Sequence, residues 1–174
     1  MTAGKLKATA RDVTVLALCA ALLFAQQVAL APLPNIELVS LMVMLFTLAF
    51  RHKVLYTIYL FALLEGVYWG FHPWWWVPYL YIWTILAGLT WLFRANRSTV
   101  LWAVLSGVFG LFSGMLFALP QFFIGGWAAA LAYWLAGIPF DLVHCTGNFV
   151  LCLVLWNPLQ KTLGYCTKRL KTQP

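Results

Sequence analysis

Apolar residues run along this chain in six long stretches, and short segments rich in proline, glycine or charge separate them. A helix that crosses a membrane needs about 20 predominantly apolar residues, which is close to the length of most of these stretches. The separating segments carry the residues that typically end such helices. The pattern therefore predicts an all-α membrane protein of a single domain over residues 1–174, with six transmembrane helices at about 12–31, 37–50, 54–71, 77–93, 99–119 and 127–156.

The last predicted helix is the longest, and it contains the sequence Gly137-Ile138-Pro139. Proline has no backbone N–H and its ring clashes with the preceding turn, so proline inside a helix kinks it. We therefore expect a kink at 137–139 in the sixth helix.

The composition agrees with this pattern, because 64% of the residues are apolar and only 9% are charged. So few charges cannot cover the surface of a soluble domain, and the hydrophobicity excludes a disordered or nucleic-acid-binding chain. The four cysteines form no CxxC pair and have no metal-ligand spacing to a histidine. We therefore expect neither a disulfide framework nor a metal site.

The basic residues all fall on one side of the predicted membrane topology. Six crossings place both termini on the same side, together with the second and fourth connections. That side collects Lys5, Lys7, Arg11, Arg51, Lys53, Arg94, Arg97, Lys161, Lys168, Arg169 and Lys171. Since Lys and Arg are enriched in cytoplasmic loops, the chain is predicted to lie in the cell membrane with both termini in the cytoplasm. The net charge of +7 is then explained by topology and by contact with anionic lipid, with no nucleic-acid partner.

Small residues repeat at four-residue spacing in two of the predicted helices. Ala17, Ala21 and Ala25 lie on one stripe of the first helix, and Gly110 and Gly114 have the same spacing in the fifth. Such a stripe lets a second helix approach closely in a membrane. The stripe in the first helix predicts either packing within the bundle or docking of a separate partner.

Three ionisable residues lie within the predicted membrane spans. Glu65 is in the third, and Asp141 and His144 are in the sixth, where Asn148 continues the same helical face. A charge at the centre of a bilayer costs at least about 2.5–3.5 kcal/mol, so such residues need a partner or a wet cavity. They either stabilise the helix packing or contact a ligand. One His and one Asp do not fill a metal coordination sphere.

The outer connections carry polar and aromatic side chains. A rigid loop at 34–37 contains Asn35 and Glu37, Gln121 lies near another outer connection, and tryptophans cluster at 74–76. Aromatic residues are common at membrane interfaces, but adjacent tryptophans point in different directions, so some are expected to line a pocket for a flat ligand. The candidate substrate-binding residues are Asn35, Glu37, Glu65, Trp69, Trp75, Tyr79, Gln121, Trp127, Tyr133, Asp141 and His144.

The sequence contains no motif of a hydrolase, a metalloprotease or a nucleotide-binding loop. We therefore expect that the protein is not an enzyme by itself. Any active transport has to take its energy from a partner that hydrolyses ATP.

The chain resembles the substrate-binding (S) component of energy-coupling-factor (ECF) vitamin transporters. The resemblance covers the whole chain and rests on its small size, its six predicted spans, its cytoplasmic termini, the stripe Ala17/Ala21/Ala25, the loop 34–37 and the run 137–148. It implies a bundle of six helices that binds one vitamin-like molecule from the outside.

In this family the alanine stripe docks on a transmembrane T component that two cytosolic ATPase subunits drive, and the S component is thought to topple. The resemblance therefore implies partner docking at Ala17, Ala21 and Ala25. Within the family the sequence looks most like cobalamin-specific S components, with cobalamin as the transported substrate and no cofactor. Another aromatic vitamin or a queuosine precursor is the alternative ligand. A membrane scaffold and a membrane enzyme are the alternative functions.

Overall fold

The computed structural model describes residues 9–172, and the described chain is built of helices without strands. A short 3₁₀ turn, η1 (Arg51–Lys53), joins the second and third helices. The six α-helices are α1 (Ala10–Leu30), α2 (Val39–Phe50), α3 (Val54–Trp69), α4 (Pro73–Leu92), α5 (Thr99–Phe117) and α6 (Leu119–Thr172). The predicted helices coincide with these six, except that α6 begins earlier and continues well past residue 156. The all-α class is confirmed.

In the described part of the chain, four segments are long and apolar enough to cross a membrane by length and composition: Ala10–Leu30, Val39–Trp69, Thr99–Phe117 and Leu119–Lys168. Helix α4 is not among them, although it has 20 residues. Its first half is rich in Trp, Tyr and Pro, and Trp and Tyr favour the membrane interface over the hydrocarbon core. The structure is that of a chain suited to a membrane, and six crossings stay a prediction.

Large apolar side chains are exposed on the outside of the bundle, among them Leu18 on α1, Val67 on α3, Leu92 on α4 and Val154 on α6. A water-soluble monomer rarely exposes extended apolar surface. This surface is compatible with contact to lipid.

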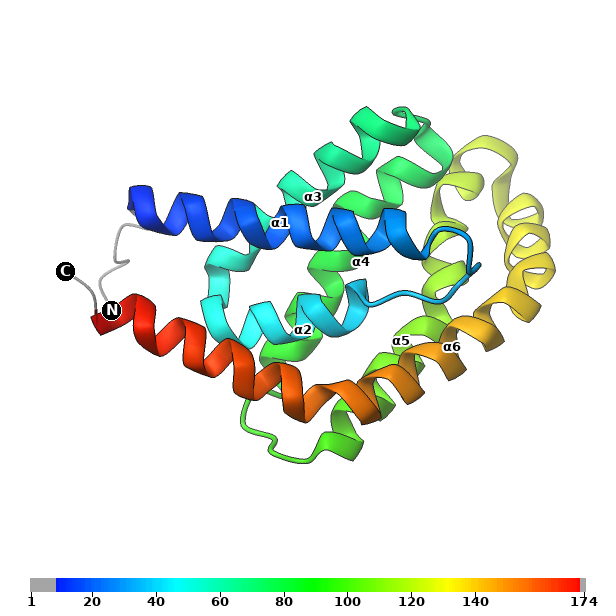
Figure 1. Cartoon of the computed structure of the whole chain (residues 1–174). Helices are drawn as coiled ribbons and strands as arrows, with labels where there is room; N and C mark the ends of the chain where they lie inside the picture. The colour runs from blue at the N-terminus through cyan, green and yellow to red at the C-terminus, as the bar shows by residue number, and fades with distance from the viewer. Residues whose placement is uncertain (1–8, 173–174) are drawn as a thin grey trace, which may run out of the picture.

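Helix α2 lies at the centre of the bundle, where every residue from Val39 to Thr47 is buried. It packs against α1, α3, α4 and α6, while α5 packs along α6. This burial on all sides explains why α2 reads as continuously apolar. Figure 1 shows that the start of α1 and the end of α6 lie on the same side of the molecule.

Local signals at the helix ends agree with the fold. Thr9 and Asp12 form a capping box that satisfies the first backbone N–H groups of α1. Lys53 Nζ lies 2.8 Å from Asp12 Oδ2 and ties this end of α1 to the connection between α2 and α3. Ser98 caps α5 by accepting a hydrogen bond from the backbone of Leu101.

The helical backbone of α6 is interrupted at Gly126. Gly126 has φ 69° and ψ −164°, which places it outside helical geometry. Glycine has no Cβ and adopts positive φ without strain. Pro139 stays inside the helix with helical dihedral angles. The backbone is thus interrupted thirteen residues before Pro139, and the kink expected at 137–139 stays a prediction.

The part of α6 after this break, residues 127–172, has 46 residues and a length of about 70 Å at 1.5 Å per residue. A hydrocarbon core is only about 30 Å thick. The helix continues past residue 156 because a helical backbone satisfies its own hydrogen bonds whether its side chains are apolar or polar. The predicted end marked the end of the apolar stretch and not the end of the helix.

Candidate functional site

A cavity of about 690 Å³ opens at the end of the bundle opposite the start of α1 and the end of α6. Its wall is built from the ends of α1 and α3, the connection between α1 and α2, the first half of α4, the second half of α5 and the first half of α6. Cavities of this size hold drug-sized ligands.

Most of the residues predicted to bind substrate lie together around this cavity. Those in its wall are Asn35, Glu37, Trp69, Trp75, Tyr79, Tyr133, Asp141 and His144. They come from positions far apart in the sequence, and only the fold brings them to one place.

Three predicted site residues do not line the cavity. Trp127 follows the Gly126 break and is 70% exposed, so it faces the outside of the bundle. Gln121 lies in the short helical segment before the Gly126 break, and it is not part of the cavity wall. Glu65 is buried behind the cavity on α3, and its Oε1 has no hydrogen-bond partner in the described part of the chain.

The structure also adds residues to the cavity wall that sequence reasoning missed. They include Gln27 at the end of α1 and Ser113 and Gly114 near the end of α5, together with Trp83 and Phe117. The pair of glutamines at 26–27 in an apolar stretch was a usable signal, because amides are costly in a membrane span. No signal in the sequence singled out Ser113 or the aromatic residues.

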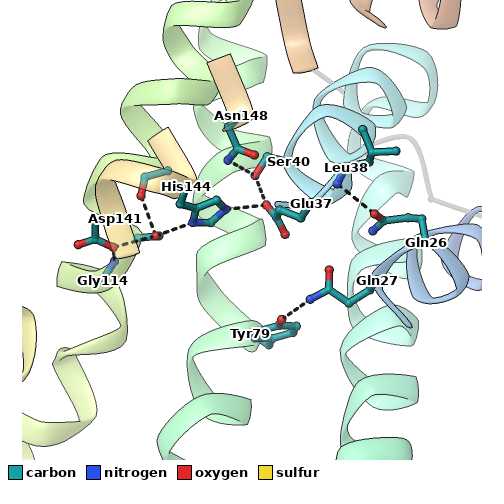
Figure 2. Close-up of polar contacts among 12 residues, drawn as sticks. Gln26, Gln27, Glu37, Leu38, Ser40, Tyr79, Gly114, Asp141, His144 and Asn148 are labelled. Carbon is teal, nitrogen blue, oxygen red and sulfur yellow. Dashed lines mark hydrogen bonds and ion pairs between the residues drawn. The ribbon is translucent and has the colours of Figure 1, made fainter. Parts of the chain in front are cut away.

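A chain of hydrogen bonds connects the loop between α1 and α2 to α5 and α6 (Figure 2). His144 Nε2 lies 3.0 Å from Glu37 Oε1, and Ser40 Oγ donates to the same oxygen at 2.6 Å. On the other side of the imidazole ring, His144 Nδ1 lies 3.0 Å from Ser113 Oγ. Both ring nitrogens are therefore engaged.

The chain of contacts extends at both ends. Asp141 Oδ1 accepts a hydrogen bond from the backbone N–H of Gly114 at 3.0 Å and lies 3.4 Å from Ser113 Oγ. Asn148 Nδ2 donates to Ser40 Oγ at 3.1 Å. The predicted polar face of α6 is thus turned inward, where Asp141 and Asn148 are buried.

The geometry of the loop places Glu37 against α6. Asn35 adopts a positive φ of 59°, and Gln26 Oε1 accepts a hydrogen bond from the backbone N–H of Leu38. A Cβ on Gly147 would lie only 2.8 Å from Ile36, so a glycine at this position lets the loop approach α6 closely. Glu37 therefore reaches His144 from a position 107 residues away in the chain.

The surroundings of Glu37 favour its charged form. Burial by itself raises the pKa of this carboxyl, but the positive charge of His144 and the hydrogen bonds from His144 and Ser40 outweigh it and hold the pKa below its usual value. No three His, Cys, Asp or Glu side chains in residues 9–172 are placed to hold a metal ion.

The two small-residue stripes have different environments. The glycines of α5 face α6, because a Cβ on Gly110 would lie 2.9 Å from the backbone oxygen of His144. This stripe serves packing within the bundle. In α1 the buried side chains include Leu16 and Leu23, whereas Ala21 and Ala25 are exposed and Ala17 is half-buried. The alanine stripe is therefore largely left open by the bundle.

The comparisons with known proteins return no family model, no curated protein and no solved structure that matches this chain.

Proposed function

We propose that the protein is the substrate-binding S component of an ECF-type transporter and captures a vitamin-like molecule from outside the cell. The observation that carries this proposal is the cavity of about 690 Å³, which combines aromatic walls with a buried hydrogen-bonding chain. Few precisely placed polar groups in an otherwise apolar pocket are typical of small-molecule sites.

The proposed topology has six crossings with both termini in the cytoplasm. The start of α1 and the end of α6 lie at the same end of the bundle, and the basic connections at 51–53 and 94–97 belong to the same side of the predicted topology. Because Lys and Arg favour cytoplasmic loops, this end of the bundle is proposed to lie in the cytoplasm, and the cavity at the opposite end then opens to the outside.

The proposed partners are a transmembrane T component and two cytosolic ATPase subunits. The exposed stripe of Ala17, Ala21 and Ala25 supports a docking surface, because small side chains let a foreign helix approach the backbone of α1. In this proposal the chain binds substrate, and ATP hydrolysis belongs to the partners.

Cobalamin is the ligand that the family resemblance favours, and another aromatic vitamin or a queuosine precursor is the alternative. A corrinoid is much larger than a single heterocycle. The cavity volume of about 690 Å³ accommodates a compact vitamin more readily than a whole corrinoid.

Isothermal titration of the detergent-purified protein tests the proposal with cobalamin, riboflavin, folate, pantothenate and queuosine precursors. We expect one of them to bind stoichiometrically with a submicromolar Kd. The variant Trp75→Ala should weaken that binding by about tenfold or more, because stacking on an aromatic ring contributes about 1–3 kcal/mol. Trp75 lines the cavity.

Trp74→Ala is the matched control, because Trp74 is the preceding residue of the same helix, is 48% exposed and does not line the cavity. Its Kd should equal that of the unchanged protein. If no compound binds to folded protein, or if both variants weaken binding equally, the proposal is wrong and a membrane scaffold takes its place.

A further inference from the structure

The cavity is acidic. Two carboxylate side chains, Glu37 and Asp141, lie in its wall, and His144 is the basic side chain beside them. Among the side chains that the structure describes, residues 9–168, no Lys or Arg contributes to this wall. With both carboxyls ionised, the formal net charge of the cluster is −1 if His144 is protonated and −2 if it is neutral.

The lysine and arginine side chains nearest in the sequence are too far away to neutralise these carboxylates. No Lys or Arg occurs between Lys53 and Arg94 or between Arg97 and Lys161. The basic side chains at these positions belong to connections at the opposite end of the bundle or to the end of α6. An anionic ligand would therefore find two carboxylates in the cavity and no lysine or arginine.

Two residues of the cavity wall each carry a buried acceptor without a hydrogen-bond partner in the described chain. Asp141 is 5% exposed, and its Oδ2 has no hydrogen-bond partner in the described chain. Gln27 Nε2 donates to the hydroxyl of Tyr79 at 3.3 Å, while Gln27 Oε1 is likewise without a partner there. A buried acceptor without a donor is costly, so each such group requires an explanation, of which a bound water or ligand is one.

Glu37 directs one of its oxygens toward the same region. Its Oε1 is taken up by His144 and Ser40, whereas its second oxygen points toward the side of Tyr79 and Gln27 (Figure 2). A ligand that enters between these side chains meets acceptors and a negative charge.

Aromatic rings form the remaining wall around these acceptors. The ring of Tyr79 packs edge-to-face against Trp75 at 5.5 Å, Trp83 at 5.6 Å and Phe117 at 6.1 Å between centroids. Aromatic faces are negative, so they attract a cation as well as a flat ring. The apolar wall and the carboxylates therefore select for the same kind of molecule.

We propose that the ligand of this cavity is a compact aromatic heterocycle that carries a protonated amine, with its N–H groups donated to the carboxylate of Glu37. This inference rests on the proposed substrate-binding function and names the substrate class. The amine neutralises the net negative charge of the cluster, and the ring stacks in the aromatic wall. The same charges disfavour an anionic vitamin.

Ring-matched pairs of compounds test the charge preference without knowledge of the natural ligand. One pair is tryptamine and indole-3-propionate, and the other is aminomethyl-deazaguanine and carboxy-deazaguanine. Each pair keeps the ring and replaces a cation by an anion. Thermal stabilisation and isothermal titration of the full chain in detergent give the relative affinities.

We expect the amine of at least one pair to bind about tenfold or more tightly than its carboxylate partner. Glu37→Gln and Asp141→Asn should each reduce this ratio, because each substitution removes a charge and keeps an oxygen acceptor for the existing hydrogen bonds. Asp12→Asn is the control, since Asp12 lies at the other end of α1 and pairs with Lys53. It should leave the ratio unchanged.

Three results would overturn the inference: a carboxylate that binds as tightly as its amine, an amine preference that survives in both Glu37→Gln and Asp141→Asn, or no binding by any of the four compounds. The first and the third result are measured on the unchanged protein alone. The test therefore remains decisive even if a variant fails to fold. If riboflavin or cobalamin binds with dependence on Trp75 while the amine preference is absent, the transporter proposal stands and the substrate class is wrong.

Discussion

The buried contact between Glu37 and His144 should stabilise the fold strongly, and a double-mutant cycle measures it. The side chains are only 10% and 13% exposed. Glu37→Ala leaves Ser40 Oγ and His144 Nε2 without the oxygen that lies 2.6 and 3.0 Å from them. Each buried polar group left unpaired costs about 1–3 kcal/mol, so the loss is about 2–6 kcal/mol for the two groups. Breaking one side of a buried ion pair costs a similar amount, about 3–5 kcal/mol.

The double variant Glu37→Ala/His144→Ala should cost much less than the sum of the two single variants. Once both partners are gone, neither leaves the other unpaired, and a coupling of about 1.5–3 kcal/mol is expected for a hydrogen bond to a charged group. The assay is equilibrium unfolding in mixed micelles, titrated with SDS and followed by tryptophan fluorescence.

The pair Lys53 and Asp12 provides the control cycle, because its side chains are 33% and 30% exposed. A pair of this exposure contributes about 0.2–1 kcal/mol. If the free energies of unfolding for the Glu37 and His144 variants add within about 0.5 kcal/mol, the two residues do not interact and the reasoning is refuted.

Three further predictions concern docking, helix packing and pH. Ala21→Leu should abolish co-purification with the proposed T component and ATPase subunits, because a bulky side chain prevents close approach of another helix. Ala132→Leu, at another exposed alanine, should retain co-purification. Equal retention by both variants would contradict a docking role for the stripe. Gly110→Ala should destabilise the bundle by about 1–3 kcal/mol in the same unfolding assay, since the added Cβ lies 2.9 Å from the backbone of His144, and unchanged stability would show that α5 and α6 separate easily. Because the pKa of Glu37 is held below its usual value, its contribution to stability is complete above a pH of about 4.5 and is lost as the pH falls through the lower folded value. Melting temperatures between about pH 5 and pH 3 should therefore fall less steeply in Glu37→Gln than in the unchanged protein, and parallel curves would contradict this.

The helices could be located from the sequence alone because a membrane-suited helix needs a long apolar stretch and ends where prolines and charges interrupt it. Each of α1 to α5 begins and ends within about four residues of its predicted range. The grouping of the basic residues and the inward polar face of α6 also follow from sequence, since charge and helical periodicity are local properties.

The break in α6 and the membership of the site could not be read from the sequence. Proline at 139 was the stronger local signal, whereas the backbone leaves helical geometry at Gly126, where glycine adopts a positive φ without strain. Trp127 and Trp75 both lie in apolar stretches of the sequence, so sequence alone does not distinguish them. In the folded chain Trp75 lines the cavity, whereas Trp127 is exposed on the outside of the bundle.

The pairing of Glu37 with His144 is the clearest case of what folding decides. Local sequence indicated that His144 needs a polar partner in a membrane, because an unpaired charge is costly there, and it placed Glu37 in an outer loop. The partner itself is 107 residues away, and the contact depends on close approach of the loop to α6 beside Gly147. Residue types and periodicity specify which polar groups require a hydrogen-bond partner. The packing of α1, α2 and α6 determines which of these groups meet, because distances between them are set only in the folded chain.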